Sequence, residues 1–471
     1  MTQQAFLIIV GLAVLGAFSN WRHGVLLFLV VGMIQDPFRK SIPGTPGYLS
    51  LVTAPVWAVV MLPFLSHFGT LAREFRAGYP GIAHAINLLV VSMIPAAFIS
   101  ATYGSGTWML TLLGIFQYSC ILFGLLIGFY FPRRPDEILR VLAFYCTGTA
   151  VALIGTHLET QQLFPSWPAI GSASLGFEWL RDVPDVRISL ISGFYRSPDI
   201  MGWHAASAAM LAMILALRSR GMGRAMWIAI VCWAAFTTIL SGRRKMVMML
   251  PVFLITTVWL HLRRRQGGSN TLPIVGLVVA GIVMIYIQVS PDASYMAYYT
   301  YEPMDLFNQL NEHGLEAVLT TIDQHGVFGA GLGVAATGAH HLSVDRPRVW
   351  QESGLGKVVV ELGLPGLVCF FYFGCSLLWA GWTQVSHRRS ATADLSIANG
   401  LFAFLIANVG SFLVSGQHFG DPFILCWFSF LIGLLLSVAR VPHSLPARHH
   451  DPIPRSGVGI TARHAPTRGQ A

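Results

Sequence analysis

Residues 240–250 read LSGRRKMVMML, which places three consecutive cations between two apolar runs. The runs at 224–241 and 245–262 are each long enough for a membrane-spanning helix, because about 20 apolar residues cross a bilayer. The whole chain is 54% hydrophobic and only 11% charged, whereas a soluble protein of this size needs more charge to cover its surface. We therefore predict a polytopic integral membrane protein.

Continuous apolar runs predict an all-α fold with about 12–13 transmembrane helices, the first two of them short. The runs lack the alternation of a barrel strand, so the backbone in lipid must be helical. The N-terminal run has no basic residues before it and is followed at once by another, which predicts a first span and not a cleaved signal peptide. The candidate spans are 4–19, 24–36, 50–68, 84–102, 107–131, 136–156, 199–217, 224–241, 245–262, 271–289, 354–380, 396–415 and 421–439.

Arginine clusters in the loops predict the orientation and the domain limits. Counting spans places these clusters on one side, which the positive-inside bias assigns to the cytoplasm. The transmembrane domain is predicted to cover 1–439, with long extracytoplasmic loops at 157–198 and 290–353. The Pro-, His- and Arg-rich segment 440–471 is predicted to be a disordered basic cytoplasmic tail. The clusters are Arg73/Arg76, Arg133/Arg134, Arg218/Arg220/Arg224, Arg263/Arg264/Arg265 and Arg388/Arg389.

Arg243, Arg244 and Lys245 then lie on the outer side, against that bias. One interpretation is a miscounted span, and a second is snorkelling of the side chains to lipid headgroups. The third is an anion site at the outer membrane face. Three adjacent cations cost about 2.5–3.5 kcal/mol each if forced to mid-bilayer, and a bound anion would compensate that cost.

Composition also argues against several classes of site. All six cysteines fall inside apolar runs, which favours small packing residues over disulfides or a metal site. The net charge of +9 lies mostly in short loops and the tail, where membrane lipid explains it without nucleic acid. The outer loops lack H-E-x-x-H and Asp-x-Asp spacings, so we predict no metal and no cofactor.

The first long loop ends in SGFYRSPDIMGWH (192–204). Pro198 suits the first turn of a helix, with Ser197 as its N-cap. Arg196 would then sit beside exposed helix N–H groups that favour an anion, although a solvated loop cation is the alternative. His204, one turn into the span, is predicted to be buried and hydrogen-bonded.

The second long loop has an amphipathic part and a glycine-rich part. Apolar residues at helical spacing in 301–325 predict a helix lying on the membrane. The run GVFGAGLGVAATGAHH (326–341) superficially matches a phosphate-cradling loop, but no strand precedes it and no Gly-Lys-Ser/Thr follows. Its glycines do permit close backbone approach.

The loop ends in RPRVWQESGLGKVVVELGLPGL (346–367), which enters the next span. Lys357 and Glu361 share a helix face and are predicted to form an ion pair. Glu352 lies near Arg348 at the span entrance, and an ionisable residue there is a functional candidate.

These segments, taken in order, resemble the O-antigen ligase and Wzy-type polysaccharide polymerase superfamily. The matching pieces are SGFYRSPDIMGWHAA (192–206), LSGRRKM (240–246), GVFGAGLG (326–333) and ESGLGKVVVELGLPGLVCFF (352–371). The motifs cover roughly 190–380, and Asp199 stands where the family usually has Asn. The resemblance implies a GT-C-like membrane glycosyltransferase fold.

The resemblance also implies a substrate and site residues. The substrate is an undecaprenyl-pyrophosphate-linked oligosaccharide, used at the periplasmic face of a bacterial inner membrane. Arg196, Arg243, Arg244 and Arg348 are the candidate pyrophosphate ligands, because a guanidinium binds phosphate bidentately and stays charged. Glu352 is the candidate catalytic base, with Arg243 and Arg244 stabilising the leaving group.

One departure from the family decides between its activities. Ligases of the family carry a His-Asn pair where this chain has Glu352-Ser353. We therefore expect an inverting, metal-independent glycosyltransferase that polymerises exopolysaccharide or O-antigen repeat units, with chain-length regulator and flippase proteins as possible partners. The alternatives are an O-antigen ligase that transfers polymer to lipid A core, and a lipid-linked oligosaccharide flippase.

Overall fold

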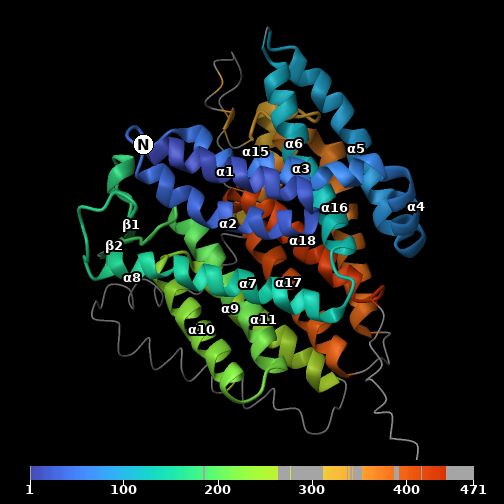
Figure 1. Ribbon diagram of the computed structural model, residues 1–471. Coiled ribbons are helices and arrows are strands. Elements are labelled where there is room, and N and C mark those ends of the chain that lie inside the picture. The colour runs from blue at the N-terminus through green and yellow to red at the C-terminus, as the bar shows by residue number, and fades with distance from the viewer. Residues whose placement is uncertain are drawn as a thin grey trace, which may run out of the picture.

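The computed structural model describes residues 2–104, 106–183, 186–263, 276, 311–336, 338–339, 342, 349, 353–386, 392–414 and 416–441. Helices account for 79% of the structure. In the described ranges the strands form a single antiparallel hairpin, β1 (Leu180–Val183) with β2 (Val186–Ser189). The predicted all-α polytopic architecture is therefore confirmed (Figure 1).

The helices follow the apolar runs of the sequence. They are α1 (Thr2–Ser19), α2 (Trp21–Lys40), α3 (Thr53–Ser66), α4 (Phe68–Gly78), α5 (Pro80–Ala101), α6 (Trp108–Tyr130), α7 (Pro135–Ala152), α8 (Ile154–Thr160), α9 (Pro198–Arg218), α10 (Gly221–Leu240), α11 (Arg244–Arg263), α15 (Ala317–His325), α16 (Gly354–Ser386), α17 (Thr392–Val414) and α18 (Pro422–Ser437). Short helical turns are η1 (Gly47–Leu51), η2 (Ala173–Leu175), η3 (Asn311–Glu316) and η5 (Gln417–Gly420).

Ten of the described helical segments are long and apolar enough to cross a membrane. Two more predicted spans are helical but fall outside that set. The 24–36 run is α2, which carries charges at both ends, and the 421–439 run is α18, an apolar helix of only 16 residues. The predicted span at 271–289 lies almost entirely outside the described residues.

Helix α9 is the centre of the bundle. Its side chains are buried from Pro198 to Ala216, and it packs against α7, α10, α11 and α17. Eight of its 21 residues are Ala, Gly or Ser in the run PDIMGWHAASAAMLAMILALR, which lets neighbouring backbones approach closely, as helices do in membranes. Whatever α9 presents at its N-terminus is therefore held by a rigid element.

At one end of the bundle, which we call the site end, charged side chains connect the termini of several helices. Lys40, the last residue of α2, donates to the carbonyl of Gly193 at 2.9 Å, just before α9. Arg196 and Asp421, which precede α9 and α18, form an ion pair. These contacts hold the end of one helix and the starts of two others together.

The opposite end of the bundle, which we call the basic end, carries arginines at or near helix termini. Arg22, at the start of α2, donates to the carbonyl oxygens of Phe131 and Tyr130 at the end of α6, at 2.9 and 3.1 Å. Arg440 pairs with Glu74 of α4 at 3.3 Å. The cations at 243–245 thus lie at the end away from these arginine clusters, as the span count predicted.

Helix α16 breaks at Gly363, where φ is 68° and ψ is −171°. The glycine-rich loop packs into this break, with Leu364 N–H donating to the carbonyl of Val327 at 2.8 Å and Ala330 N–H to that of Val360 at 2.7 Å. The break therefore replaces lost helical hydrogen bonds with bonds to a loop, which is how non-helical backbone is tolerated at membrane depth.

Candidate functional site

The site is built around the N-terminus of α9. Ser197 is extended, and its hydroxyl accepts from the backbone N–H of Ile200 at 3.4 Å, while Pro198 begins the helix. Asp199 lies in the first turn, where a carboxylate is favoured by the helix dipole. The predicted N-cap and first turn are confirmed, and they fix Arg196 one residue before the cap.

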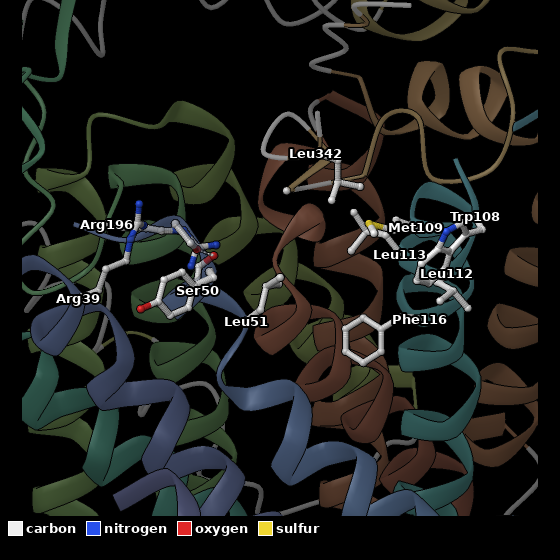
Figure 2. A pocket seen from close by; sticks show the side chains of 13 residues that line it. Arg39, Ser50, Leu51, Trp108, Met109, Leu112, Leu113, Phe116, Arg196 and Leu342 are labelled. Atoms are coloured by element: carbon white, nitrogen blue, oxygen red, sulfur yellow. Dashed lines mark hydrogen bonds between the residues drawn. The ribbon is translucent and has the colours of Figure 1, made fainter. Parts of the chain in front are cut away.

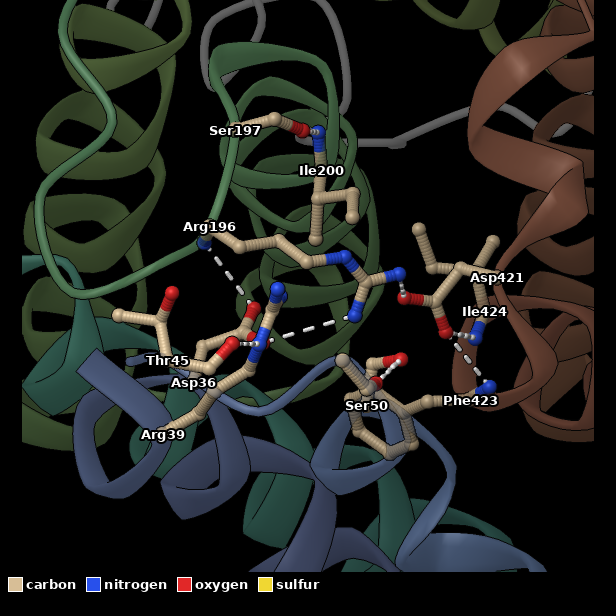
Figure 3. Close-up of polar contacts among 11 residues, drawn as sticks. Asp36, Arg39, Thr45, Ser50, Arg196, Ser197, Ile200, Asp421, Phe423 and Ile424 are labelled. Carbon is tan, nitrogen blue, oxygen red and sulfur yellow. Dashed lines mark hydrogen bonds and ion pairs between the residues drawn. The ribbon is translucent and has the colours of Figure 1, made fainter. Parts of the chain in front are cut away.

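Arg196 lies between two carboxylates (Figure 3). Its guanidinium pairs with Asp421 and, at 3.5 Å, with Asp36 of α2, whose other oxygen accepts from the Arg196 backbone N–H at 3.1 Å. Burial alone would lower the pKa of Arg196, but the carboxylates of Asp421 and Asp36 outweigh it and raise the pKa. Arg196 is therefore a fixed cation whose charge is already neutralised, not a solvated loop residue.

Asp421 has a second role at the start of α18. One of its oxygens accepts from the backbone N–H groups of Phe423 and Ile424 at 2.7 and 3.2 Å, while the other pairs with Arg196. The carboxylate is 1% exposed. It thus caps one helix and ties it to the residue that precedes another, which makes the geometry of the site depend on a single side chain.

Two further cations from the end of α2 surround this cluster. Arg39 Nε donates to the carbonyl of Thr45 at 3.3 Å, and Lys40 donates to Gly193. The carboxylate of Glu159 accepts from the N–H groups of Ser192 and Gly193 at 3.0 and 2.6 Å. Lys40 and Glu159 thus hold the loop that leads to α9.

Arg243 and Lys245 converge on Asp199. The Arg243 guanidinium lies 2.8 Å from one oxygen of this carboxylate, and the Lys245 ammonium lies 2.9 Å from the other. Arg244, between them, is half-buried at the first position of α11. The carboxylate of Asp199 is therefore shared by two cations from the loop and the helix that follow α10.

The predicted anion-site residues can now be compared with their positions. Arg196 and Arg243 both lie near the N-terminus of α9. Arg196 pairs with Asp36 and Asp421, and Arg243 pairs with Asp199. Arg348 and Glu352 lie outside the described residues, so their predicted roles stay predictions.

A cavity of about 640 Å³ opens beside Arg196 (Figure 2). Arg39 and Arg196 lie at one side of it, with Ser50 nearby, and the first two turns of α6 form an apolar wall at the other. Its lining is Arg39, Gly47, Tyr48, Ser50, Leu51, Trp108, Met109, Leu112, Leu113, Phe116, Arg196, Gly338 and Leu342. A cavity with two guanidinium groups on one side and hydrocarbon on the other fits an amphipathic anion.

Three glycines of the glycine-rich loop pack against helices, whereas Gly338 of the same loop lines the cavity. Gly329, Gly331 and Gly333 all have positive φ, and a Cβ at each would meet backbone atoms of a neighbouring helix. At Gly331, for instance, that atom is the backbone nitrogen of Ser100 at 2.7 Å. The close approach expected from the glycines is therefore to helices α5, α6 and α16.

His204 is buried, as predicted. Its Nδ1 is 2.8 Å from the hydroxyl of Tyr145, and its ring stacks between Tyr195 and Phe423 at centroid distances of 5.2 and 5.1 Å. Four aromatic contacts and a phenol hydrogen bond are typical of a packing residue.

Other predictions take a modified form. Lys357 acts on Glu361 electrostatically, but the hydrogen bond to this carboxylate comes from Tyr118 of α6 at 3.0 Å. The described part of the predicted 301–325 helix is helical, as η3 and α15, and Val318 on it is buried. The six cysteines are free: three are buried, two are half-buried, and Cys375 is exposed on α16.

Sequence reasoning missed the carboxylates. Asp36 and Asp421 lie at the borders of apolar runs, where a charged residue is expected at the membrane interface and indicates no particular partner. The signal was available in QDPFRK (35–40), which places opposite charges at one helix end, and in the solitary Asp421 before an apolar run.

The sequence matches no model of a known protein family, and no curated protein is significantly similar to it.

Proposed function

We propose that the chain is an inverting, metal-independent glycosyltransferase that polymerises polyprenyl-pyrophosphate-linked oligosaccharide repeat units. The reaction would take place at the site end, which we place at the periplasmic face of a bacterial inner membrane from the positive-inside bias of the basic end. The observation that carries the proposal is the amphipathic cavity of about 640 Å³ beside the N-terminus of α9. The motif resemblance supplies the reaction class.

The cavity suits the two parts of such a substrate. The pyrophosphate would face Arg39 on the cationic side of the cavity, and the isoprenoid chain would lie along the apolar residues of α6. Trp108 is 59% exposed and Leu112 is 53% exposed, so this wall offers hydrocarbon surface without local rearrangement.

The structure changes the role we assign to Arg196. Two carboxylates already hold its guanidinium, so binding an anion there would bring the ligand close to Asp36 and Asp421. We assign Arg196 to positioning of the helix termini and of the cavity wall. Arg243 and Arg244 remain the candidates for stabilising the leaving pyrophosphate, with Arg39 as an additional contact.

The chemistry is a single displacement. The acceptor sugar hydroxyl gives its proton to the carboxylate of Glu352 as its oxygen attacks the anomeric carbon. The bond from that carbon to the pyrophosphate oxygen breaks, and its electron pair leaves with the polyprenyl pyrophosphate. Cations placed where this charge develops lower the barrier, and one displacement inverts the anomeric configuration.

Substitutions in cells test the proposal. Arg243→Gln and Glu352→Gln should lower polymer formation about 100-fold or more, because each removes a group that acts on developing charge or on the proton. Lipid-linked single repeat units should then accumulate. Arg73→Gln, an exposed arginine at the basic end, is the matched control and should leave polymer unchanged.

Other outcomes point to the other functions. Long polymer that stays unattached to lipid A core would indicate a ligase, and substrate trapped on the cytoplasmic face would indicate a flippase. Normal polymer in both variants at normal protein level would reject the proposal.

A further inference from the structure

A second cavity, of about 320 Å³, lies at the basic end of the bundle, away from the site described above. It is formed where α1 ends, α2 begins and α3 ends. Its lining is Ala17, Phe18, Ser19, Asn20, Trp21, Arg22, Val59, Leu62, Pro63 and Arg133. Two arginines and a tryptophan at helix termini are typical of the membrane interface, where headgroups meet hydrocarbon.

The polar side of this cavity is cationic. Arg22 is fixed by hydrogen bonds from its Nε and Nη2 to the carbonyl oxygens that end α6, and its guanidinium lies 4.3 Å from the ring of Trp21. Arg133 is close enough to act on Arg22 electrostatically. No acidic side chain belongs to the described lining of the cavity.

Glu137 lies outside the cavity lining but is hydrogen-bonded to the backbone of one of its arginines. Glu137 acts on Arg22 from a distance, and one of its oxygens accepts from the backbone N–H of Arg133 at 2.8 Å. The Arg133 side chain itself is exposed. A phosphate would therefore meet one fixed and one adjustable guanidinium, with the N-terminus of α2 adding a favourable dipole.

The apolar side of the cavity continues along the outside of α1. Ile8, Leu12, Leu15 and Phe18 are each more than 60% exposed, and their spacing of four, three and three residues places them on one face. Phe18, at the end of this stripe, also lines the cavity. An acyl chain whose headgroup sits on the arginines would lie along this stripe.

We infer that this cavity binds an anionic phospholipid, with its phosphate between Arg22 and Arg133 and an acyl chain along the apolar stripe of α1. The site is independent of the proposed glycosyltransferase activity. It would couple the ends of α1, α2 and α6 to the composition of the surrounding leaflet.

The test uses the full-length protein in phosphatidylcholine nanodiscs with increasing phosphatidylglycerol. Native mass spectrometry counts retained phosphatidylglycerol, and the thermal midpoint reports stabilisation by binding. Each arginine near an anionic lipid surface contributes about a fivefold preference, so R133Q should weaken retention about fivefold and R22Q/R133Q roughly 25-fold. Because R22Q also removes bonds to α6, R133Q alone keeps the test decisive if the double variant does not fold.

The matched control is R73Q/R76Q, which removes two exposed arginines of α4 at the same end. It should leave retention unchanged. Equal loss in R133Q and R73Q/R76Q, or no loss in R133Q, would overturn the inference, since retention would then follow overall charge. Glycerol 3-phosphate should bind far more weakly than the lipid, and equal binding would show a phosphate site without an acyl chain.

Discussion

Replacing Asp421 by Asn tests whether the ion pair with Arg196 holds the site end together. The change removes one negative charge but keeps the size of the side chain and an oxygen that can cap α18. The Asp421 carboxylate is 1% exposed and the Arg196 side chain 13%, so the pair is buried. Removing one partner of a buried pair costs about 3–5 kcal/mol, and we expect the lower end because Asp36 still faces the guanidinium.

The effect of Asp421→Asn on the free energy of unfolding should change sign when Arg196 is also replaced. In Arg196→Met, the cation is gone and two buried carboxylates are left without it, so that variant should itself lose about 3–5 kcal/mol. Adding Asp421→Asn then removes one of the two uncompensated charges and should stabilise the protein. Asp421→Ala in the native background should cost about 1 kcal/mol more than Asp421→Asn, because the α18 cap is lost as well.

The measurement is reversible unfolding in mixed micelles of dodecyl maltoside and SDS, followed by tryptophan fluorescence. The double-mutant cycle over Arg196 and Asp421 gives the coupling free energy directly. If Asp421→Asn destabilises both backgrounds equally, or costs less than 1 kcal/mol in the native one, the pair does not carry the stability argued for it.

Two further predictions concern packing. Gly329 and Gly326 have φ of 75° and 76°, but a Cβ at Gly329 would meet the carbonyl oxygen of Val360 at 2.6 Å, whereas at Gly326 it meets open space. Gly326 has ψ of 176°, a backbone region nearly restricted to glycine, so Gly326→Ala should cost about 1–3 kcal/mol of backbone strain. Gly329→Ala should cost clearly more in the same unfolding assay, and equal costs would contradict the contact with α16. Asn408→Leu should lower the free energy of unfolding by about 1–3 kcal/mol, because the buried indole N–H of Trp203 loses the amide oxygen that accepts from it at 2.8 Å. A change at the red edge of the tryptophan fluorescence should accompany this loss.

Local patterns in the sequence were enough to predict the helices and the start of α9. Apolar runs located the spans because each run must satisfy its backbone within lipid. Ser197 followed by Pro198 located the N-cap because both residues act on their own turn. Gly363 shows the limit of this reasoning: the apolar run continues through it, and the break forms because a loop about 35 residues earlier in the chain supplies the missing hydrogen bonds.

The partners of the site cations could not be predicted in the same way. Asp36 and Asp421 are separated by almost the whole transmembrane domain, and nothing local to either residue says that Arg196 lies between them. Pairing of this kind depends on which helix termini meet at one end of the bundle, which follows from packing along the full length of α2, α9 and α18. Asp199 was the one clue, because a buried carboxylate in the first turn of a helix requires a cation nearby.

These carboxylates alter the energetic argument for a ligand. Cations at the site end would need a bound anion if the chain offered no compensation, but Arg196, Arg243 and Lys245 each have a carboxylate from another helix or loop. Their presence alone therefore does not imply a ligand. The argument rests instead on the cavity, where Arg39 and Arg196 lie opposite an apolar wall whose Trp108 and Leu112 are more than half exposed. Arg39→Gln is accordingly the substitution that separates the two explanations, because it leaves the ion pairs of Arg196, Arg243 and Lys245 intact. It should weaken binding of the proposed lipid-linked substrate, while loss of the hydrogen bond to Thr45 lowers the free energy of unfolding by only about 1 kcal/mol.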